Sequence, residues 1–212
     1  MRLKPIASII THAFAYVVKT SKIFNIDESH AVKHSMDVYN YANKIYQHEL
    51  ITRPILEKQK EIIYVSAILH DMCDKKYMSE KEGIMMIKKH MLDYMPVSNI
   101  DVMSSIISTM SYSKVKANGY PNLGEYQLAY HIVREADLLT AYDIDRTVIY
   151  GIYQEGLPYD KSLQRASNIL ETRVLKYIDD NLFVTDYSKK EAVKLHIKAE
   201  IDLDNLKKII YY

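Results

Sequence analysis

A histidine and an aspartate stand side by side at the end of a strongly apolar segment of this sequence. His70 and Asp71 follow residues 62–69, which read Ile-Ile-Tyr-Val-Ser-Ala-Ile-Leu. A segment that is apolar nearly all round is typical of a central helix, so both ionisable groups should emerge inside the core. Burying an imidazole and a carboxylate is costly unless they are paired, hydrogen-bonded or bound to a metal. A lone His-Asp dipeptide is more often a helix end with a satisfied histidine, so further residues are needed to indicate a site.

Two such residues lie in similarly apolar surroundings. His34 belongs to a segment with a core-facing stripe of apolar side chains, and Asp137 belongs to residues 132–139, Ile-Val-Arg-Glu-Ala-Asp-Leu-Leu. Together with the His-Asp pair they make four ionisable groups on three core segments. This combination indicates one shared metal ion.

The same residues carry a resemblance to a known family. The ordered segments 29–34 (Ser-His-Ala-Val-Lys-His), 69–71 (Leu-His-Asp) and 134–141 (Arg-Glu-Ala-Asp-Leu-Leu-Thr-Ala) resemble the motifs of the HD-domain superfamily of metal-dependent phosphohydrolases. The resemblance covers about residues 27–150 and implies an all-α, HD-domain-like helical bundle. It also implies the metal ligands, which are His34, His70, Asp71 and Asp137.

The expected site has mixed nitrogen and oxygen ligands and a single ion. Two imidazoles and two carboxylates suit divalent Mn, Fe, Co, Ni, Zn or Mg, and the set does not choose among them. The count of one rests on Met110, which stands where the family often has a histidine. Because a thioether cannot replace an imidazole on a hard divalent ion, a mononuclear site is expected. Glu135 and Thr140 also depart from the family pattern, which often has aspartates at these positions.

Groups for proton transfer and phosphate binding are expected close to the His-Asp pair. Asp74 follows Asp71 by about one helical turn and is the candidate general acid or base. The candidate substrate-binding residues are Lys75, Lys76 and Arg146. Each of these four side chains has a simpler interpretation as a solvated charge. His30, one helical turn before His34, is interpreted as a supporting or helix-start residue rather than a ligand.

The activity that the resemblance implies is hydrolysis of a phosphate ester, with a nucleotide or another small molecule as the expected substrate. An alternative is an HD-type phosphodiesterase acting on a cyclic nucleotide, a cyclic dinucleotide or a nucleic acid. The residue at position 110 and the net charge of +1 disfavour it. A third interpretation is a metal- or nucleotide-sensing module without turnover, which the intact ligand set disfavours.

Helices should position these groups, because the sequence has only five Gly and five Pro and few alternating β-branched runs. The predicted helices span about residues 4–21, 27–49, 54–71, 79–93, 98–111, 124–141, 145–155, 160–181 and 186–210. Asp27 and the pair Ser79 and Glu82 should cap two of them, and residues 112–123 should form the longest loop. Residues 1–212 are expected to form a single HD-type domain, with the motif core at about 27–150 and C-terminal helices at about 160–212 packed on it.

The composition favours a soluble protein of a reducing compartment. Cys73 is the only cysteine and is interpreted as a small core residue, so a cytoplasmic location is expected. No apolar stretch approaches the ~20 residues that span a bilayer, and His12 interrupts the stretch that mimics a signal peptide. The expected partner is a small phosphate ester. The amphipathic residues 191–212 either pack on the same bundle or offer a face for a homodimer. Neither a membrane nor a nucleic acid is expected.

Overall fold

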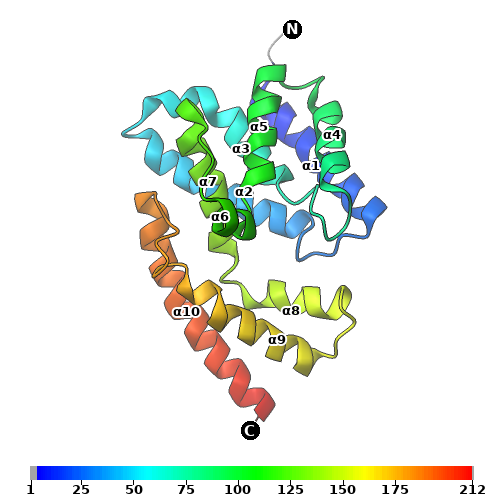
Figure 1. Ribbon diagram of the computed structural model, residues 1–212, viewed down its shortest axis with the longest axis vertical. Coiled ribbons are helices and arrows are strands. Elements are labelled where there is room, and N and C mark those ends of the chain that lie inside the picture. The colour runs from blue at the N-terminus through cyan, green and yellow to red at the C-terminus, as the bar shows by residue number, and fades with distance from the viewer. Residues whose placement is uncertain (1–3, 212) are drawn as a thin grey trace.

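The fold is all-α. The structure, a computed structural model, describes the backbone of residues 4–211 and the side chains of residues 4–208. Within these residues it contains ten α-helices, three short 3-10 helices and no strand, arranged as the bundle in Figure 1. No helix of this described part is both long and apolar enough to cross a membrane. The all-α helical bundle predicted from the sequence is confirmed.

The elements follow one another along the chain through short connections. The α-helices are α1 (Ile6–Phe24), α2 (Val32–Leu50), α3 (Lys60–Leu69), α4 (Glu80–Met91), α5 (Val97–Thr109), α6 (Tyr112–Asn118), α7 (Gln127–Thr140), α8 (Ile144–Tyr153), α9 (Tyr159–Thr172) and α10 (Asp186–Tyr211). The 3-10 helices are η1 (Pro54–Gln59), η2 (Gly124–Tyr126) and η3 (Val174–Lys176).

Helix α3 connects the two halves of the hydrophobic core. Residues 62–69 are all buried, and the helix packs against α1, α2, α5 and α7. Ile63 belongs to a cluster shared with α2, α7 and α10, whereas Ile68 belongs to a second cluster shared with α1, α4 and α5. Because α3 is packed on both sides, its C-terminal end is fixed. The position of His70 and Asp71, which follow it, is therefore fixed as well.

The C-terminal helices form a second group, seen in the lower part of Figure 1. Helices α8 and α9 pack closely where Gly151 meets Ser162. A Cβ atom at position 151 would lie 2.6 Å from the Ser162 hydroxyl oxygen, so this approach requires glycine. Helix α10 packs on α2 and α7 and buries Ala192, Ala199 and Leu203 in their shared core.

Helix α10 also carries an exposed apolar stripe. Val193, Ile197 and Ile201 are four residues apart, so they lie on one face of the helix, and each is about half exposed. This stripe is where the predicted contact with a second copy of the chain would form, and that contact stays a prediction. Tyr212, the last residue of the predicted contact segment, lies outside the described residues.

A buried carboxylate ties α7 to the segment that leads into α10. Glu135 accepts hydrogen bonds from the backbone N–H groups of Val184 and Thr185 at 2.7 and 3.1 Å, and from the Thr185 hydroxyl at 2.7 Å. The neighbouring Arg134 donates to the Leu182 carbonyl oxygen at 2.5 Å. Glu135 therefore has a structural role, which its departure from the family motif did not reveal.

The structure corrects one predicted helix start and one predicted helix cap. Residues 27–31 form a turn, because the Asp27 carboxylate accepts the Ser29 N–H at 2.9 Å and competes with helical hydrogen bonding. Ser79 occupies the N-cap position of α4, but its side chain makes no capping hydrogen bond, so the predicted capping box is wrong. Glu82 instead places a negative charge in the first turn, where the helix dipole favours it.

Three other predicted elements also differ. Residues 54–59, predicted as the start of an α-helix, form the 3-10 helix η1, which begins at Pro54. Residues 112–118 form the short helix α6 instead of a loop, and Gly119 ends it with a φ of +73°. The helix predicted over 160–181 ends at Thr172, because Arg173 leaves the helical conformation before η3 begins.

Replacing Glu135 by alanine is expected to lower the free energy of unfolding by about 2–4 kcal/mol, because three donors would lose their acceptor. Urea unfolding followed by circular dichroism measures this change. Glu171→Ala, which removes an exposed carboxylate paired with Lys207, is the control and should cost less than about 1 kcal/mol. Equal costs for the two variants would contradict the structural role of Glu135.

Candidate metal centre

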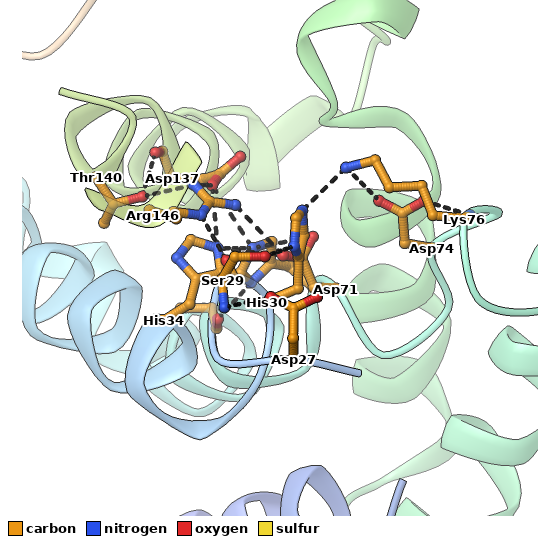
Figure 2. Close-up of polar contacts among 12 residues, drawn as sticks. Asp27, Ser29, His30, His34, Asp71, Asp74, Lys76, Asp137, Thr140 and Arg146 are labelled. Carbon is orange, nitrogen blue, oxygen red and sulfur yellow. Dashed lines mark hydrogen bonds and ion pairs between the residues drawn. The ribbon is translucent and has the colours of Figure 1, made fainter. Parts of the chain in front are cut away.

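The four residues expected to bind metal come from three packed helices. His34 lies in the first turn of α2, His70 and Asp71 directly follow the last residue of α3, and Asp137 lies in the last turn of α7. Helices α2, α3 and α7 each pack against the other two. Figure 2 shows His34, Asp71 and Asp137 gathered in one place where these helices meet.

Their ligand atoms lie a few ångströms from one another. Nε2 of His34 is 3.0 Å from Nε2 of His70, and Oδ1 of Asp137 is 3.5 and 3.6 Å from these two nitrogens. Oδ2 of Asp71 is 3.2 Å from Nε2 of His34, and its Oδ1 is 3.3 Å from Nε2 of His70. One atom each of His34, His70 and Asp137 lie within 4.8 Å of one another, a spacing that one ion can bridge. The structure thus brings all four residues together.

An unsatisfied polar atom at this point fits a bound cation. Oδ2 of Asp71 is buried and has no hydrogen-bond partner among the described residues. Nδ1 of His70 donates to the Ala67 carbonyl oxygen at 2.9 Å, so Nε2 is the nitrogen that can present a lone pair to an ion. Imidazole nitrogens and carboxylate oxygens are common ligands of divalent metals. The residues present therefore fit a divalent metal ion.

Both carboxylates of the cluster stay ionised although they are largely shielded from solvent. Burial opposes the charge of Asp71, but His70 and His30 hold the pKa of its carboxyl well below its usual value. Burial also opposes the charge of Asp137, and hydrogen bonds from His34 and His70 hold its pKa low. Burial lowers the pKa of His70, but the two carboxylates outweigh this effect and raise it to about 10. The negative field that raises this pKa would also attract a divalent cation.

Arg146 lies directly beside the two carboxylates. Its Nη2 is 3.6 Å from Oδ2 of Asp71, and its Nη1 is 3.6 Å from Oδ1 of Asp137. Nε donates to the Ser29 carbonyl oxygen at 2.6 Å and Nη1 donates to the Thr140 hydroxyl at 3.3 Å (Figure 2). These bonds fix the guanidinium, so the residue expected to bind substrate phosphate stands next to the expected metal ligands.

A pocket of about 240 Å³ opens onto the cluster. His70, Asp71 and Asp137 line it. The residues expected to act on the substrate line the same pocket, and they are Asp74, Lys75, Lys76 and Arg146. Met110 is buried and also lines it, so the chain presents a thioether there rather than an imidazole.

Asp74 borders the pocket from the turn after α3. Its Oδ1 accepts the backbone N–H of Lys76 at 2.8 Å, and its Oδ2 lies 3.6 Å from Nζ of the same lysine. The side chain is 22% exposed, whereas that of Asp71 is 14% exposed. The Asp74 carboxylate therefore reaches both solvent and the pocket, which a group that exchanges protons requires.

His30 supports the cluster without belonging to the group of ligand atoms. Burial and nearby positive charges lower its pKa to about 3, although Asp71 acts in the opposite direction. The neutral ring accepts a hydrogen bond at Nε2 from Nζ of Lys76, 2.9 Å away. Its proton is then on Nδ1, which donates to the Ser29 hydroxyl oxygen at 2.6 Å. His30 thereby links Lys76 to the turn that holds Arg146.

Two other residues of metal-binding type stand apart from the cluster. Burial raises the pKa of the Cys73 thiol to about 12, so the thiolate that metals prefer does not form near neutral pH. His90 packs beside the Tyr16 ring, and its Nε2 donates to the His12 carbonyl oxygen at 3.2 Å. Cys73 is a buried core residue, in agreement with its interpretation from the sequence.

Comparisons with known proteins inform the fold. No protein-family model matches the chain, and no curated protein matches it. A crystal structure of a structural genomics target from Lactobacillus plantarum is similar to it, with a TM-score of 0.68 and 18% sequence identity. The similarity covers 95% of this chain and 96% of the other. At this identity it shows a shared fold over nearly the whole length of both chains.

Metal added to the chelator-treated protein is expected to bind at about one ion per chain and to stabilise it. At a metal concentration of about a hundred times Kd, the melting temperature should rise by roughly 5–10 °C, because only the folded chain offers the site. His34→Gln should abolish both effects, whereas His90→Gln, the control, should keep both. Plasma emission and thermal unfolding with Mn²⁺ measure them. Two ions per chain, or equal binding by both variants, would contradict the site.

Proposed function

We propose that this protein is a metal-dependent phosphohydrolase that cleaves a phosphate ester of a nucleotide or another small molecule. The observation that carries the proposal is the convergence of two buried histidines and two partly exposed aspartates with cationic side chains at one pocket. Phosphoryl transfer needs this combination, because charge on the phosphoryl oxygens must be stabilised from several sides. The resemblance of the ordered motifs to the HD-domain superfamily supports the same reaction.

The cluster would hold the metal, and its hydrogen bonds orient it for this role. The residues that would hold one divalent ion are His34, His70, Asp71 and Asp137. When bound, such an ion activates a water molecule and stabilises negative charge on a phosphoryl group. The bond from His70 to the Ala67 carbonyl oxygen fixes the ring so that Nε2 faces the carboxylates.

Cationic side chains that line the same pocket would bind the phosphoryl oxygens. Arg146 is held by Ser29 and Thr140, so its planar guanidinium is already oriented for a phosphate. Lys76 is held near the pocket by its hydrogen bond to His30. Lys75 is exposed and lines the same pocket, so it would add a mobile positive charge.

Asp74 would transfer the proton. Its carboxylate is fixed by the Lys76 N–H and borders the pocket beside Asp71. In this position it can take a proton from the attacking water or give one to the leaving group. Because Oδ1 is occupied by the backbone bond, Oδ2 is the oxygen that would do so.

The volume of the pockets and the net charge of the chain favour a small substrate. The pocket at the cluster measures about 240 Å³ and adjoins a second one of about 260 Å³. Together they reach the range of roughly 300–1,000 Å³ that is common for small-molecule sites. A net charge of +1 provides little of the long-range attraction on which nucleic-acid binding depends. A phosphate ester of a small molecule is therefore favoured over a nucleic acid.

A reducing compartment, the cytoplasm, is the location we propose for the enzyme. Cys73 is a free, buried thiol, and a protein with one such cysteine gains nothing from an oxidising environment. The structure of the described residues is held by core packing and buried hydrogen bonds such as those of Glu135.

Variants of two neighbouring aspartates, Asp71 and Asp74, distinguish metal binding from proton transfer. Asp71→Ala should weaken metal binding and abolish hydrolysis together, because it removes an anionic ligand. Asp74→Asn should keep the metal, since the amide oxygen still accepts the Lys76 N–H. It should nevertheless lower turnover by roughly 10²–10⁴-fold, because the amide cannot take up a proton. Metal content by plasma emission and initial rates on p-nitrophenyl phosphate measure the two effects in the same preparations.

Full activity in Asp74→Asn would show that this residue is a solvated charge at the turn. Loss of metal in the same variant would show that it belongs to the coordination network. Either result would contradict its assignment to proton transfer.

A substrate screen with Mn²⁺-loaded protein tests the reaction itself. Nucleoside monophosphates and triphosphates, cyclic nucleotides and simple phosphate esters should include a hydrolysed compound. Turnover confined to cyclic dinucleotides or nucleic acid would favour the phosphodiesterase instead. Tight nucleotide binding without any turnover would favour a sensing module and contradict the proposed activity.

A further inference from the structure

A second cavity, of about 260 Å³, continues from the pocket at the metal centre. Its walls come from α8, α9 and the segment around η3, with Lys76 entering from the turn after α3. The two cavities share part of their lining, including His30, Lys76, Arg146 and Arg173. A single small molecule can therefore extend from one cavity into the other.

The lining of this second cavity is strongly cationic. The charged side chains in it are Lys76, Arg146, Arg165 and Arg173, and no aspartate or glutamate of the described residues lines it. Arg146 faces the carboxylates of the metal centre. Lys76 lines both cavities, so it can also contact an anion in the second one. Arg165 and Arg173 have no function in the proposed reaction at the metal centre, so they require a different explanation.

Arg173 is held in place without being neutralised. Its Nε donates to the Tyr177 hydroxyl at 3.0 Å, and its guanidinium lies 4.2 Å from the centre of the Tyr112 ring. Among the described residues, no carboxylate forms an ion pair with it. Its two Nη groups remain available to a ligand, which is the arrangement that binds phosphate through two parallel hydrogen bonds.

Arg165 and Lys76 approach the same aromatic ring. The Arg165 guanidinium lies 5.2 Å and the Lys76 ammonium 5.1 Å from the centre of the Tyr150 ring. Nε of Arg165 pairs with Glu155 at 2.7 Å, which again leaves the Nη groups available. The ring therefore positions two cationic groups at the edge of the cavity.

The surrounding carboxylates do not cancel this charge. Glu155 balances part of the charge of Arg165, and Asp74, 3.6 Å from Nζ, balances part of that of Lys76. Three cations against two partly exposed carboxylates leave an excess of positive charge at the cavity. Tyr150 and Tyr177 add polar edges to an otherwise narrow space.

We propose that Lys76, Arg165 and Arg173 form a second anion subsite, so that the substrate carries two phosphoryl groups, one at the metal centre and one in this cavity. This inference rests on the proposed phosphohydrolase function. Helices α8 and α9 then determine the substrate class, because they supply Tyr150 and Arg165. A substrate with two phosphates would be held at both ends, and a monophosphate only at the reacting end.

Equilibrium dialysis with radiolabelled inorganic phosphate tests this inference without any turnover. The chelator-treated wild type should bind about one phosphate per chain, and the Mn²⁺-loaded wild type about two. The double variant Arg165→Gln/Arg173→Gln should lose the metal-independent site, with affinity at least about tenfold weaker, or about 1.4 kcal/mol. It should keep the metal-dependent site. Arg53→Gln is the control, because Arg53 pairs with Glu49 as Arg165 pairs with Glu155, but Arg53 lines neither cavity.

Phosphate binding by the double variant equal to that of wild type would overturn the subsite, as would an equal loss in Arg53→Gln. Failure of the proposed function gives a different pattern. In that case Mn²⁺ adds no phosphate site, while the metal-independent site and its loss in the double variant remain.

Discussion

Two partly exposed carboxylates beside two buried imidazoles are the interaction on which the rest of this structure depends. Asp71 and Asp137 keep their negative charge in the core because His34 and His70 lie within 3.2–3.6 Å of them. Such a cluster is costly to shield from water, and atoms without a hydrogen bond, such as Oδ2 of Asp71, add to the cost. The cluster lies where the three central helices α2, α3 and α7 meet. A metal ion bound there would offset the cost.

The C-terminal helices add a cationic side chain to the cluster that the central helices form. Helix α8 supplies Arg146, whose guanidinium faces both carboxylates and whose Nε is held by the turn before α2. Buried Glu135 on α7 holds the segment that leads into α10. The ligands thus come from one group of helices and the cationic groups largely from another. Under the proposed function, substitutions in α8 and α9 would change substrate binding and leave the proposed metal ligands in place.

The sequence predicted the parts of this arrangement that depend on local pattern. The apolar segment 62–69 followed by His70 and Asp71 identified a central helix and its buried ionisable end, because burial follows from composition over a few turns. The sequence did not predict interactions between distant segments. Glu135 meets Thr185 across fifty residues and Arg173 shares a cavity with Lys76, and neither pairing leaves a local signal. The turn at 27–31 was missed because the Asp27 side chain, read as a helix cap, closes a turn instead.

The most direct test of the account is anomalous diffraction from crystals grown with Mn²⁺. The account predicts one anomalous peak per chain at the cluster, about 2.0–2.3 Å from Nε2 of His34, Nε2 of His70 and a carboxylate oxygen of each aspartate. Crystals of the chelator-treated protein should show no such peak. A fully loaded crystal whose peaks all lie elsewhere, with Arg146 still spanning the two carboxylates, would contradict it.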